Sequence, residues 1–514
     1  MRYWCLVLLT GLSLIWGCSK TAEKEQMQFP VIEFTIADVH KAFKEGRCTC
    51  EQLVKQYLTR IEKYDQSTKL NSIVRLNPAI MDEAKRLDEE FSKTGKLKPL
   101  HCIPVIVKDN YNTEGIETTA GSLTMAGTIS DKDAYQVRKI KDAGALVLAK
   151  SNMAEWAFSP MVTISSIAGE TLNPYNLLHT TAGSSGGTAA AVAANLGMIG
   201  LGTDTGNSIR GPSSHNALVG FRSTFGLTSR EGIVPLYLRN DVGGPMARTV
   251  EDATKILQVI AGYDPNDPVT AYCTGKVEED YLQFLDKDGL KGARIGVFRT
   301  LSERDTDPQV SVLFNQAIED MKALGAVIVD SVEVPNFESH SSNQWCPVFP
   351  HDLNEYLVSL NGKSKLKSFD QILPSGKYSD YIKANLEYFV TNSVDPNEED
   401  SVCSDPYIDR RRISYRRAME NAMDKYDVEV LIYPSWNHPP ARIGDFSGYK
   451  GDNSQIIAPH TGQPAFTVPM GYSYDNLPAG LQFLGRMYDE PTLIRLTYAY
   501  EQGTLHRTPP AKFE

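Results

Sequence analysis

The segment from Ile103 to Asn110 reads IPVIVKDN, a run of apolar β-formers that ends in a lysine, an aspartate and an asparagine. Two more short apolar runs follow it, at Ala145 to Ala149 and at Met198 to Leu201. Helical patterns lie near Asp133 to Ala143 and in the Ala-rich stretch 188–196. Because β-rich runs that alternate with helices are typical of a sheet with both faces covered, the sequence predicts an α/β fold.

The rest of the chain extends this pattern in both directions. A capping box at Thr49-Cys50-Glu51-Gln52 opens one helix, and Asn77-Pro78 opens another that runs to about Phe91. We expect later strands at Arg294–Phe298, Ala326–Val329, Val428–Tyr433, Ala465–Val468 and Gly480–Leu484, and a helix near Gln309–Leu324. The stretch 336–427 is polar with weak periodicity, and we interpret it as a variable, helical, substrate-side region. No internal repeat is present, so we predict one large domain over residues 31–514, built on a central mixed sheet.

The composition restricts the class of partner. The chain has 514 residues, 41% of them hydrophobic and 22% charged, which is enough to bury a large core. The formal net charge is −11 and no run of five basic residues occurs, which argues against nucleic-acid binding. Cys48-Thr49-Cys50 lacks the two-residue gap of common zinc motifs and no histidine cluster accompanies it, so we expect no metal. The six cysteines beyond the leader are too few for a disulfide scaffold, and their pairing cannot be deduced.

The N-terminus has the pattern of an export signal. Arg2 precedes an apolar run from Trp4 to Trp16, which is shorter than the about 20 residues that a spanning helix needs. The run ends in Leu14-Ile15-Trp16-Gly17-Cys18, which resembles a bacterial lipobox with Cys18 as the lipidated residue. We therefore expect a signal peptide at 1–18, a flexible tether at 19–30 and an exported lipoprotein whose lipid is its only membrane contact. The alternatives are an ordinary signal peptide and a short anchor.

Two glycine-rich segments contain the candidate catalytic serines. Residues 181–188 read TAGSSGGT, and residues 200–212 read GLGTDTGNSIRGP. Small residues at this density allow backbone amides to converge near Ser208. A serine nucleophile needs a base, and Lys108 at a buried strand end would have a lowered pKa and could act as a neutral amine. Such a lysine is by itself more often a paired residue, so spacing alone leaves the base open among Lys, His and a carboxylate.

In their order along the chain, the segments 103–110, 183–187 and 202–212 resemble those of the amidase signature family. Residues 118–122, 144–153, 244–249 and 461–465 are also similar to family segments, so that the resemblance covers residues 31–510. It implies a Ser-cisSer-Lys triad in which Ser208 attacks, Ser184 relays the proton and Lys108 is the base. It further implies hydrolysis of a small-molecule carboxylic amide through an acyl-enzyme, without a cofactor.

The same resemblance assigns supporting roles. Backbone N–H groups of Thr205, Gly206, Asn207 and Ser208 would form the oxyanion hole. Ser185 would support Lys108 by hydrogen bonding, and Asp204 and Arg210 would hold the shape of the loop. The sequence departs from the family at two places. Asn207 replaces a common glycine, where we expect a positive φ that Asn tolerates. Thr181-Ala182-Gly183 replaces the common Arg-Gly-Gly.

Several alternatives compete with this assignment. The segment 183–187 also fits G-x-S-x-G, which would make Ser185 the nucleophile of an α/β-hydrolase with His215, His438 or His460 as the base. A preceding strand and an Asp partner in the required order are missing from the sequence. Ser364-Lys365-Leu366-Lys367 fits S-x-x-K, but it lies in a basic polar stretch. An amidotransferase A subunit is disfavoured by the leader, and a silent binding lipoprotein by the intact triad. The substrate stays open among aliphatic or aryl amides, C-terminal peptide amides and N-acyl amines, as does the oligomeric state.

Overall fold

The computed structural model describes Met1 and residues 30–398 and 403–514. The predicted signal peptide beyond Met1, Cys18 and the tether up to residue 29 lie outside the described residues. Within the described ranges, no helix combines the length and the hydropathy that crossing a bilayer requires.

A mixed sheet of 11 strands organises the described residues, with the order β1-β3-β2-β6-β8-β7-β12-β13-β11-β9-β10. Strand β2 is parallel to β3 and β6, and β9 is parallel to β10 and β11, whereas the remaining pairs are antiparallel. The strands are β1 Ile73–Leu76, β2 Pro104–Lys108, β3 Leu146–Ser151, β6 Ile199–Asp204, β7 Val219–Arg222, β8 Val242–Ala247, β9 Arg294–Val297, β10 Val327–Asp330, β11 Val430–Pro434, β12 Ala465–Ser473 and β13 Leu477–Leu484. A small hairpin pairs β4 Ile164–Ser165 with β5 Gly169–Glu170. The predicted α/β class is confirmed.

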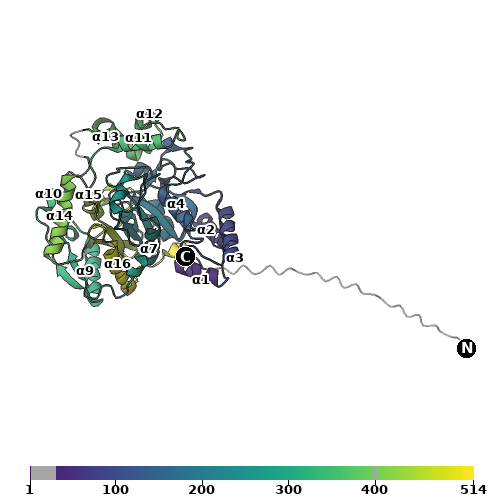
Figure 1. Ribbon diagram of the computed structural model, residues 1–514, viewed down its shortest axis with the longest axis horizontal. Helices are drawn as coiled ribbons and strands as arrows, with labels where there is room; N and C mark the ends of the chain where they lie inside the picture. The colour runs from purple at the N-terminus through teal and green to yellow at the C-terminus, as the bar shows by residue number, and fades with distance from the viewer. Residues whose placement is uncertain (2–29, 399–402) are drawn as a thin grey trace.

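Helices cover the sheet on both faces. They are α1 Ile36–Lys44, α2 Cys50–Tyr64, α3 Ile80–Thr94, α4 Tyr135–Asp142, α5 Gly186–Ala193, α6 Arg210–His215, α7 Val250–Ile260, α8 Arg299–Ser302, α9 Pro308–Ala323, α10 Phe337–Ser341, α11 Phe349–Ser359, α12 Ile372–Ser375, α13 Lys383–Asn392, α14 Arg410–Lys425, α15 Ala458–Thr461 and α16 Glu490–Thr504. Figure 1 shows α4, α7, α16 and α9 in a row across one face. The short helices α5 and α6 pack against the sheet from the other face and contact each other.

Glycines allow α5 to pack closely against the sheet. A Cβ on Gly187 would lie 2.2 Å from the carbonyl oxygen of Asn152, and one on Gly200 would lie 2.3 Å from Cγ2 of Thr188. Both distances are far below van der Waals contact, so any side chain at these positions would push the helix away. Helix α5 can therefore begin beside the carboxyl ends of β2 and β6.

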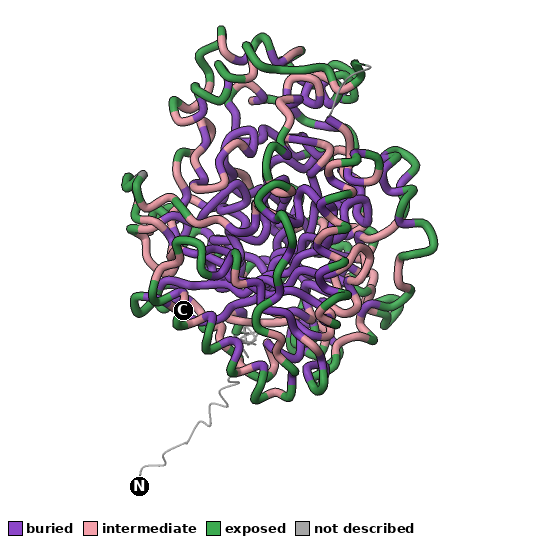
Figure 2. Tube along the Cα trace, turned by 90° about the vertical axis from the view of Figure 1, so that its left-hand side faces the viewer, coloured by how far each residue is buried: buried purple, intermediate pink, exposed green. Residues whose placement is uncertain are grey.

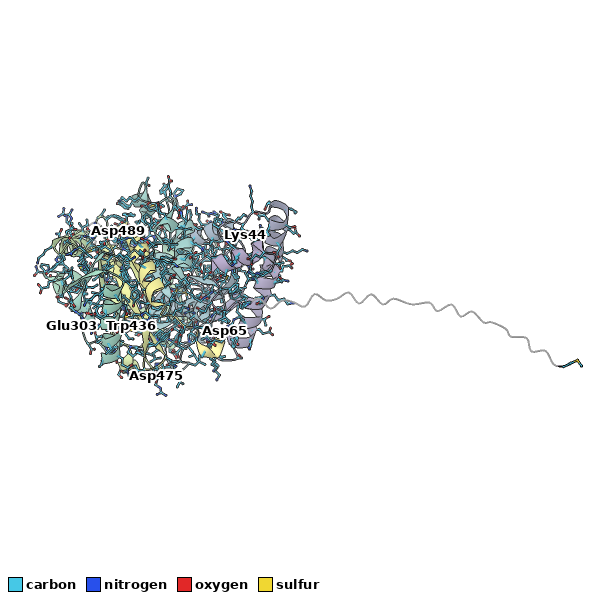
Figure 3. The ribbon with its side chains drawn as sticks, turned by 90° about the horizontal axis from the view of Figure 1, so that it is seen from below. Lys44, Asp65, Glu303, Trp436, Asp475 and Asp489 are labelled. Carbon is cyan, nitrogen blue, oxygen red and sulfur yellow. A yellow bond between two sulfur atoms is a disulfide. The ribbon has the colours of Figure 1, made fainter. Side chains whose placement is uncertain are left out.

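Seen from below in Figure 3, Lys44 and Asp65 mark the end that contains α1 and α2, and Glu303 marks the opposite end. Figure 2 shows that the buried chain is concentrated in the middle of the molecule, with exposed segments around it.

The region 336–427 is mostly helical and lies partly outside the sheet layers. Figure 1 shows α11, α12 and α13 grouped at the top of the molecule. Their apolar side chains pack on Met153, Trp156 and Ala157, which follow β3. Disulfides join Cys346 to Cys403 in this region and Cys50 to Cys102 near the start of β2. The variable region thus packs on the segment that follows β3, and the Cys346–Cys403 disulfide links two parts of the region itself.

Candidate active site

Lys108 is the last residue of β2 and its side chain is fully buried. Its Nζ lies 2.7 Å from Ser184 Oγ and 2.7 Å from Thr203 Oγ1. Burial lowers the pKa of Lys108 to about 7, although the negative charges of Asp241 and Asp204 act in the opposite direction. A neutral amine is therefore readily available at this position near neutral pH, as the sequence predicted from the buried strand end.

Ser184 follows a cis peptide bond with Gly183 and precedes α5. The backbone two residues earlier has left-handed geometry, with φ of 57° at Ala182. Asn207 has no positive φ, so our expectation for that residue is wrong. The unusual backbone falls instead on Ala182, in the segment that replaces Arg-Gly-Gly, where an L-residue costs about 1–2 kcal/mol. Of the two departures from the family, the replacement of Arg-Gly-Gly by Thr181-Ala182-Gly183 is therefore the one that places a non-glycine residue at a positive φ.

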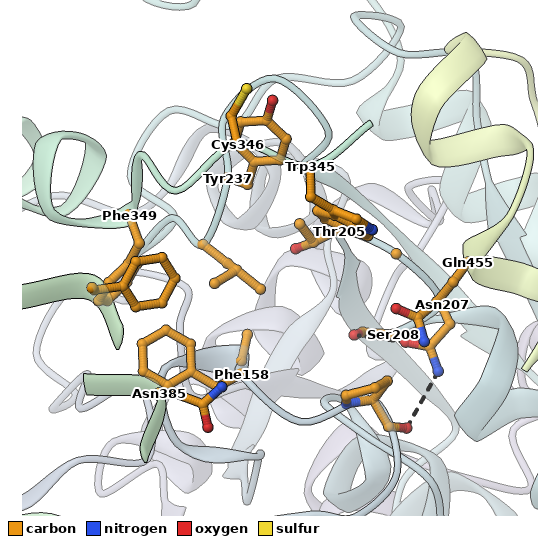
Figure 4. A pocket seen from close by; sticks show the side chains of 15 residues that line it. Phe158, Thr205, Asn207, Ser208, Tyr237, Trp345, Cys346, Phe349, Asn385 and Gln455 are labelled. Carbon is orange, nitrogen blue, oxygen red and sulfur yellow. Dashed lines mark hydrogen bonds between the residues drawn. The ribbon is translucent and has the colours of Figure 1, made fainter. Parts of the chain in front are cut away.

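Ser208 lies in the loop between β6 and α6 and is 4% exposed. Its Oγ donates a hydrogen bond to Asn207 Oδ1 at 3.4 Å, and Asn207 Nδ2 donates to the carbonyl oxygen of Pro160 at 3.3 Å, drawn as a dashed line in Figure 4. Among the hydrogen bonds of the described residues, none joins Ser208 to Ser184 and none uses the backbone N–H of Gly206, Asn207 or Ser208 as a donor. These amides are thus available for a ligand, and the Ser208 hydroxyl is directed at Asn207 rather than at Ser184.

A buried network of ion pairs contacts the loop that contains Ser208. Asp204 accepts from Arg210 Nε at 3.0 Å and from Arg222 Nη1 at 2.9 Å, and all three side chains are buried. Burial alone would raise the pKa of Asp204, but the two guanidinium charges lower it to about 2. Arg210 Nη2 also donates to the carbonyl oxygen of Gly206 at 2.7 Å. Asp204 and Arg210 therefore contact the loop itself.

Ser185 differs from the sequence-based assignment, and Thr203 is a contact of the lysine that the sequence analysis did not assign. Ser185 was expected to bond to Lys108, but its Oγ donates to the carbonyl oxygen of Thr203 at 3.2 Å and accepts from the Thr203 N–H at 3.3 Å. Thr203 supplies the hydroxyl beside Lys108 and also accepts from Asn110 Nδ2 at 3.1 Å. The sequence contains a signal for this contact, because β2 and β6 are parallel neighbours whose carboxyl ends meet at one edge. Ser185 thus bonds to the backbone of Thr203, whose side chain contacts Lys108.

A cavity of about 210 Å³ opens above Ser208. It is lined by Ala157, Phe158, Pro160, Thr205, Gly206, Asn207, Ser208, Leu236, Tyr237, Trp345, Cys346, Phe349, Asn385, Phe389 and Gln455. Figure 4 shows Ser208, Asn207 and Gln455 at one end and Phe158, Phe349 and Asn385 at the other. Phe158 packs on Phe349 and Phe389, with ring centroids 4.7 and 5.4 Å away. The cavity thus has a nucleophile end and an aromatic end.

Comparison with known proteins identifies the chain. The family model described as Amidase matches residues 52–494. The chain belongs to the amidase family. A probable amidase of Arabidopsis thaliana is 32% identical over 98% of this chain and 97% of its own. A glutamyl-tRNA(Gln) amidotransferase subunit of Alkaliphilus metalliredigens is 32% identical over 91% of this chain and 96% of its own. The crystal structure of native peptide amidase from Stenotrophomonas maltophilia is 35% identical, with a TM-score of 0.82 over 94% of this chain and 99% of that one.

This membership confirms the family resemblance and makes the protein a hydrolase of carbon–nitrogen bonds in amides. The rival α/β-hydrolase assignment of Ser185 finds no base, because neither His215, His438 nor His460 hydrogen-bonds to it in the described residues. His215 instead packs on Trp436 with ring centroids 4.6 Å apart, and burial lowers its pKa to about 3. In this amidase, the Ser364 hydroxyl accepts from Thr128 Oγ1 at 3.1 Å, and Lys367 Nζ donates to the Ser364 carbonyl oxygen rather than to that hydroxyl.

One group of possible metal ligands occurs among the described residues. Ligand atoms of Cys50, Asp88 and Cys102 lie within 4.8 Å of one another. The two cysteines form a disulfide, and Asp88 accepts from the backbone N–H groups of Cys50 and Glu51. These atoms thus already form a disulfide or accept hydrogen bonds. They do not line the cavity.

Proposed function

We propose that the amidase acts through Ser208 as nucleophile, Ser184 as proton relay and Lys108 as base. The contact between Lys108 Nζ and Ser184 Oγ, 2.7 Å inside a fully buried site, carries this proposal. As the Ser208 oxygen bonds to the amide carbon, its proton passes to Ser184 while the Ser184 proton passes to the Lys108 amine. The free N–H groups of Gly206, Asn207 and Ser208 stabilise the negative oxygen that develops on the substrate.

The second half of the reaction reverses the proton flow. The C–N bond breaks as Ser184 gives its proton to the leaving nitrogen and regains one from the Lys108 ammonium. An ester of Ser208 remains, and water attacks it with the same relay accepting the water proton. The products are the carboxylic acid and the amine or ammonia, and the enzyme returns to its starting protonation.

For the substrate, we propose amides at the C-terminus of peptides or N-acylated amino acids with a large apolar side chain. The aromatic end of the cavity, formed by Phe158, Phe349 and Phe389, suits such a side chain on the acyl side of the scissile bond. The structural similarity to a peptide amidase supports the same class. Simple aliphatic amides would leave the aromatic end empty.

For the location, we propose an exported protein with a lipid on Cys18. The apolar run before Cys18 supports export. The two disulfides support an oxidising compartment, where such bonds persist. Replacement of Cys18 by Ala should move the protein from the membrane to the soluble fraction of cells that process lipoproteins. Retention in the membrane would overturn the lipid anchor.

The catalytic assignment is tested with a protein comprising residues 19–514 and N-acetyl-L-phenylalaninamide, by following ammonia release. Ser208→Ala should lower kcat by more than about 10³-fold, since it removes the nucleophile. Ser185→Ala is the matched control in the neighbouring loop, and its loss should be much smaller because Ser184, Ser208 and Lys108 remain. Circular dichroism checks that both variants are folded. Full loss in Ser185→Ala with retained turnover in Ser208→Ala would instead identify Ser185 as the nucleophile.

A further inference from the structure

Gln455 lies at the nucleophile end of the cavity, beside Asn207 and Ser208 in Figure 4. A Cβ built on Gly206 would lie 3.2 Å from Gln455 Oε1 and 3.2 Å from Gln455 Cγ. The glutamine side chain therefore rests directly against the loop that would form the oxyanion hole. The sequence did not predict a site at residues 452–455, because they belong to no recognised motif.

The amide group of Gln455 has a defined orientation. Its Nε2 donates to Asp452 Oδ2 at 2.8 Å. Burial raises the pKa of Asp452 to about 7, and above that pH the ionised carboxylate can only accept. Asp452 is fixed in turn by the backbone N–H of Ser454, which donates to Oδ1 at 3.1 Å. In the described residues, Oε1 of Gln455 accepts no hydrogen bond. Gln455 thus offers the cavity a hydrogen-bond acceptor, Oε1, rather than a donor.

The short segment that carries Gln455 is tied to the catalytic loop. Ser454 Oγ donates to Gln482 Oε1 at 3.0 Å, and the same oxygen accepts from Arg210 Nη1 at 2.9 Å. Asn453 Nδ2 donates to the carbonyl oxygen of Pro434 at 2.9 Å, at the end of β11. Because Arg210 also bonds to Gly206, the acceptor on Gln455 and the oxyanion loop share one rigid support.

The position of this acceptor indicates that it contacts the acyl side of the substrate rather than the leaving group. In the proposed mechanism the leaving nitrogen must approach Ser184, which contacts Lys108, and neither residue lines the cavity. Gln455 lines the nucleophile end of the cavity, where the acyl part of the substrate begins before it extends toward the aromatic end. In an N-acylated amino-acid amide, an N–H group lies two bonds from the carbonyl carbon on this acyl side. This N–H group is the donor nearest to the scissile carbonyl from which Oε1 can accept a hydrogen bond.

We propose that Gln455, oriented by Asp452, accepts the acylamino N–H of the residue whose amide is cleaved. Gln455 is then a specificity residue and Asp452 a positioning residue. Together they make the enzyme prefer N-acylated α-amino-acid amides over carboxamides that lack this N–H. The inference rests on the proposed function, because it takes Ser208 as the nucleophile.

The test compares N-acetyl-L-phenylalaninamide with (S)-2-acetoxy-3-phenylpropanamide, in which an oxygen replaces the acylamino N–H. Ammonia release gives kcat/KM for each. The wild type should prefer the N–H substrate by about 3- to 10-fold, the size of one lost hydrogen bond to a half-buried acceptor. Gln455→Met should bring the ratio close to one by slowing the N–H substrate alone. Asp452→Asn should lower the ratio partly, because Asn permits the glutamine amide to flip. Asn385→Ala, at the other end of the cavity, should leave the ratio unchanged.

The outcomes separate the two proposals. Equal losses for both substrates in Gln455→Met would assign Gln455 a structural role and overturn the inference. Equal turnover of both substrates by the wild type would also overturn it, while the proposed function stands. A wild type that cleaves neither substrate would remove the proposed substrate class and this inference with it. Thermal unfolding of each variant shows whether a loss reflects misfolding.

Discussion

The two sides of Ser208 are built differently. On the inner side, Lys108, Ser184 and Thr203 are buried and linked by contacts of 2.7 Å. On the outer side, Trp345 is 48% exposed and Phe389 half-buried, in a region held by a disulfide and by helices outside the sheet layers. The inner side is formed by the ends of β2 and β6 and by the loop before α5, whereas Trp345 and Phe389 on the outer side come from 336–427. We therefore expect inner variants to change kcat and outer variants to change substrate preference.

The largest effect should come from the inner side. Lys108→Ala should lower kcat by about 10³-fold or more with little change in KM, because the base acts in the transition state rather than in binding. In the wild type, kcat/KM should rise with pH through about 7, since the lysine is protonated and inactive below that pH. Steady-state kinetics from pH 5 to 9 measures both. A flat profile would contradict a neutral lysine base.

An intermediate effect should come from the aromatic end of the cavity. Phe389→Ala enlarges that end and removes contacts with the substrate side chain, which costs about 10- to 100-fold in kcat/KM for N-acetyl-L-phenylalaninamide. N-acetyl-L-alaninamide is the control substrate, because it does not reach the aromatic end and should be little affected. Equal losses for both substrates would show that the variant disturbs the catalytic loop rather than the cavity wall.

The smallest effect on activity should come from the two disulfides. Cys346 and Cys403 are separated by 57 residues and Cys50 and Cys102 by 52, so chain entropy predicts a similar loss of about 4 kcal/mol when either bond is removed. Only Cys346 lines the cavity. Cys346→Ser should therefore raise KM by about 3- to 10-fold through a less ordered wall, whereas Cys50→Ser should leave KM unchanged. Denaturant unfolding and steady-state kinetics measure the two quantities. A rise in KM in both variants would remove the distinction between the disulfides.

The same division explains what the sequence could predict. Lys108 and the serine loops lie in short segments with their own pattern, and eight of the strands in the described sheet have a matching apolar run. Strands β1, β7 and β8 were not predicted, since Gly and Pro interrupt β8 and a short strand such as β1 has little pattern. Phe389 and Gln455 belong to ordinary helical segments, and only tertiary packing brings them beside Ser208. Ser185 and Asn207 were given contacts or geometry from the family, and the actual neighbours in this chain decide otherwise.

The exposed indole of Trp345 has a spectroscopic consequence. Residues 19–514 contain three tryptophans, and Trp156 and Trp436 are buried. Trp345 alone among these lies at the cavity mouth, with its ring 3.2 Å from where a Cβ on Gly206 would be. Its fluorescence is therefore open to collisional quenchers such as iodide in the free enzyme and shielded when a ligand fills the cavity. Occupancy can thus be read optically in the inactive Ser208→Ala protein, without turnover and without a label.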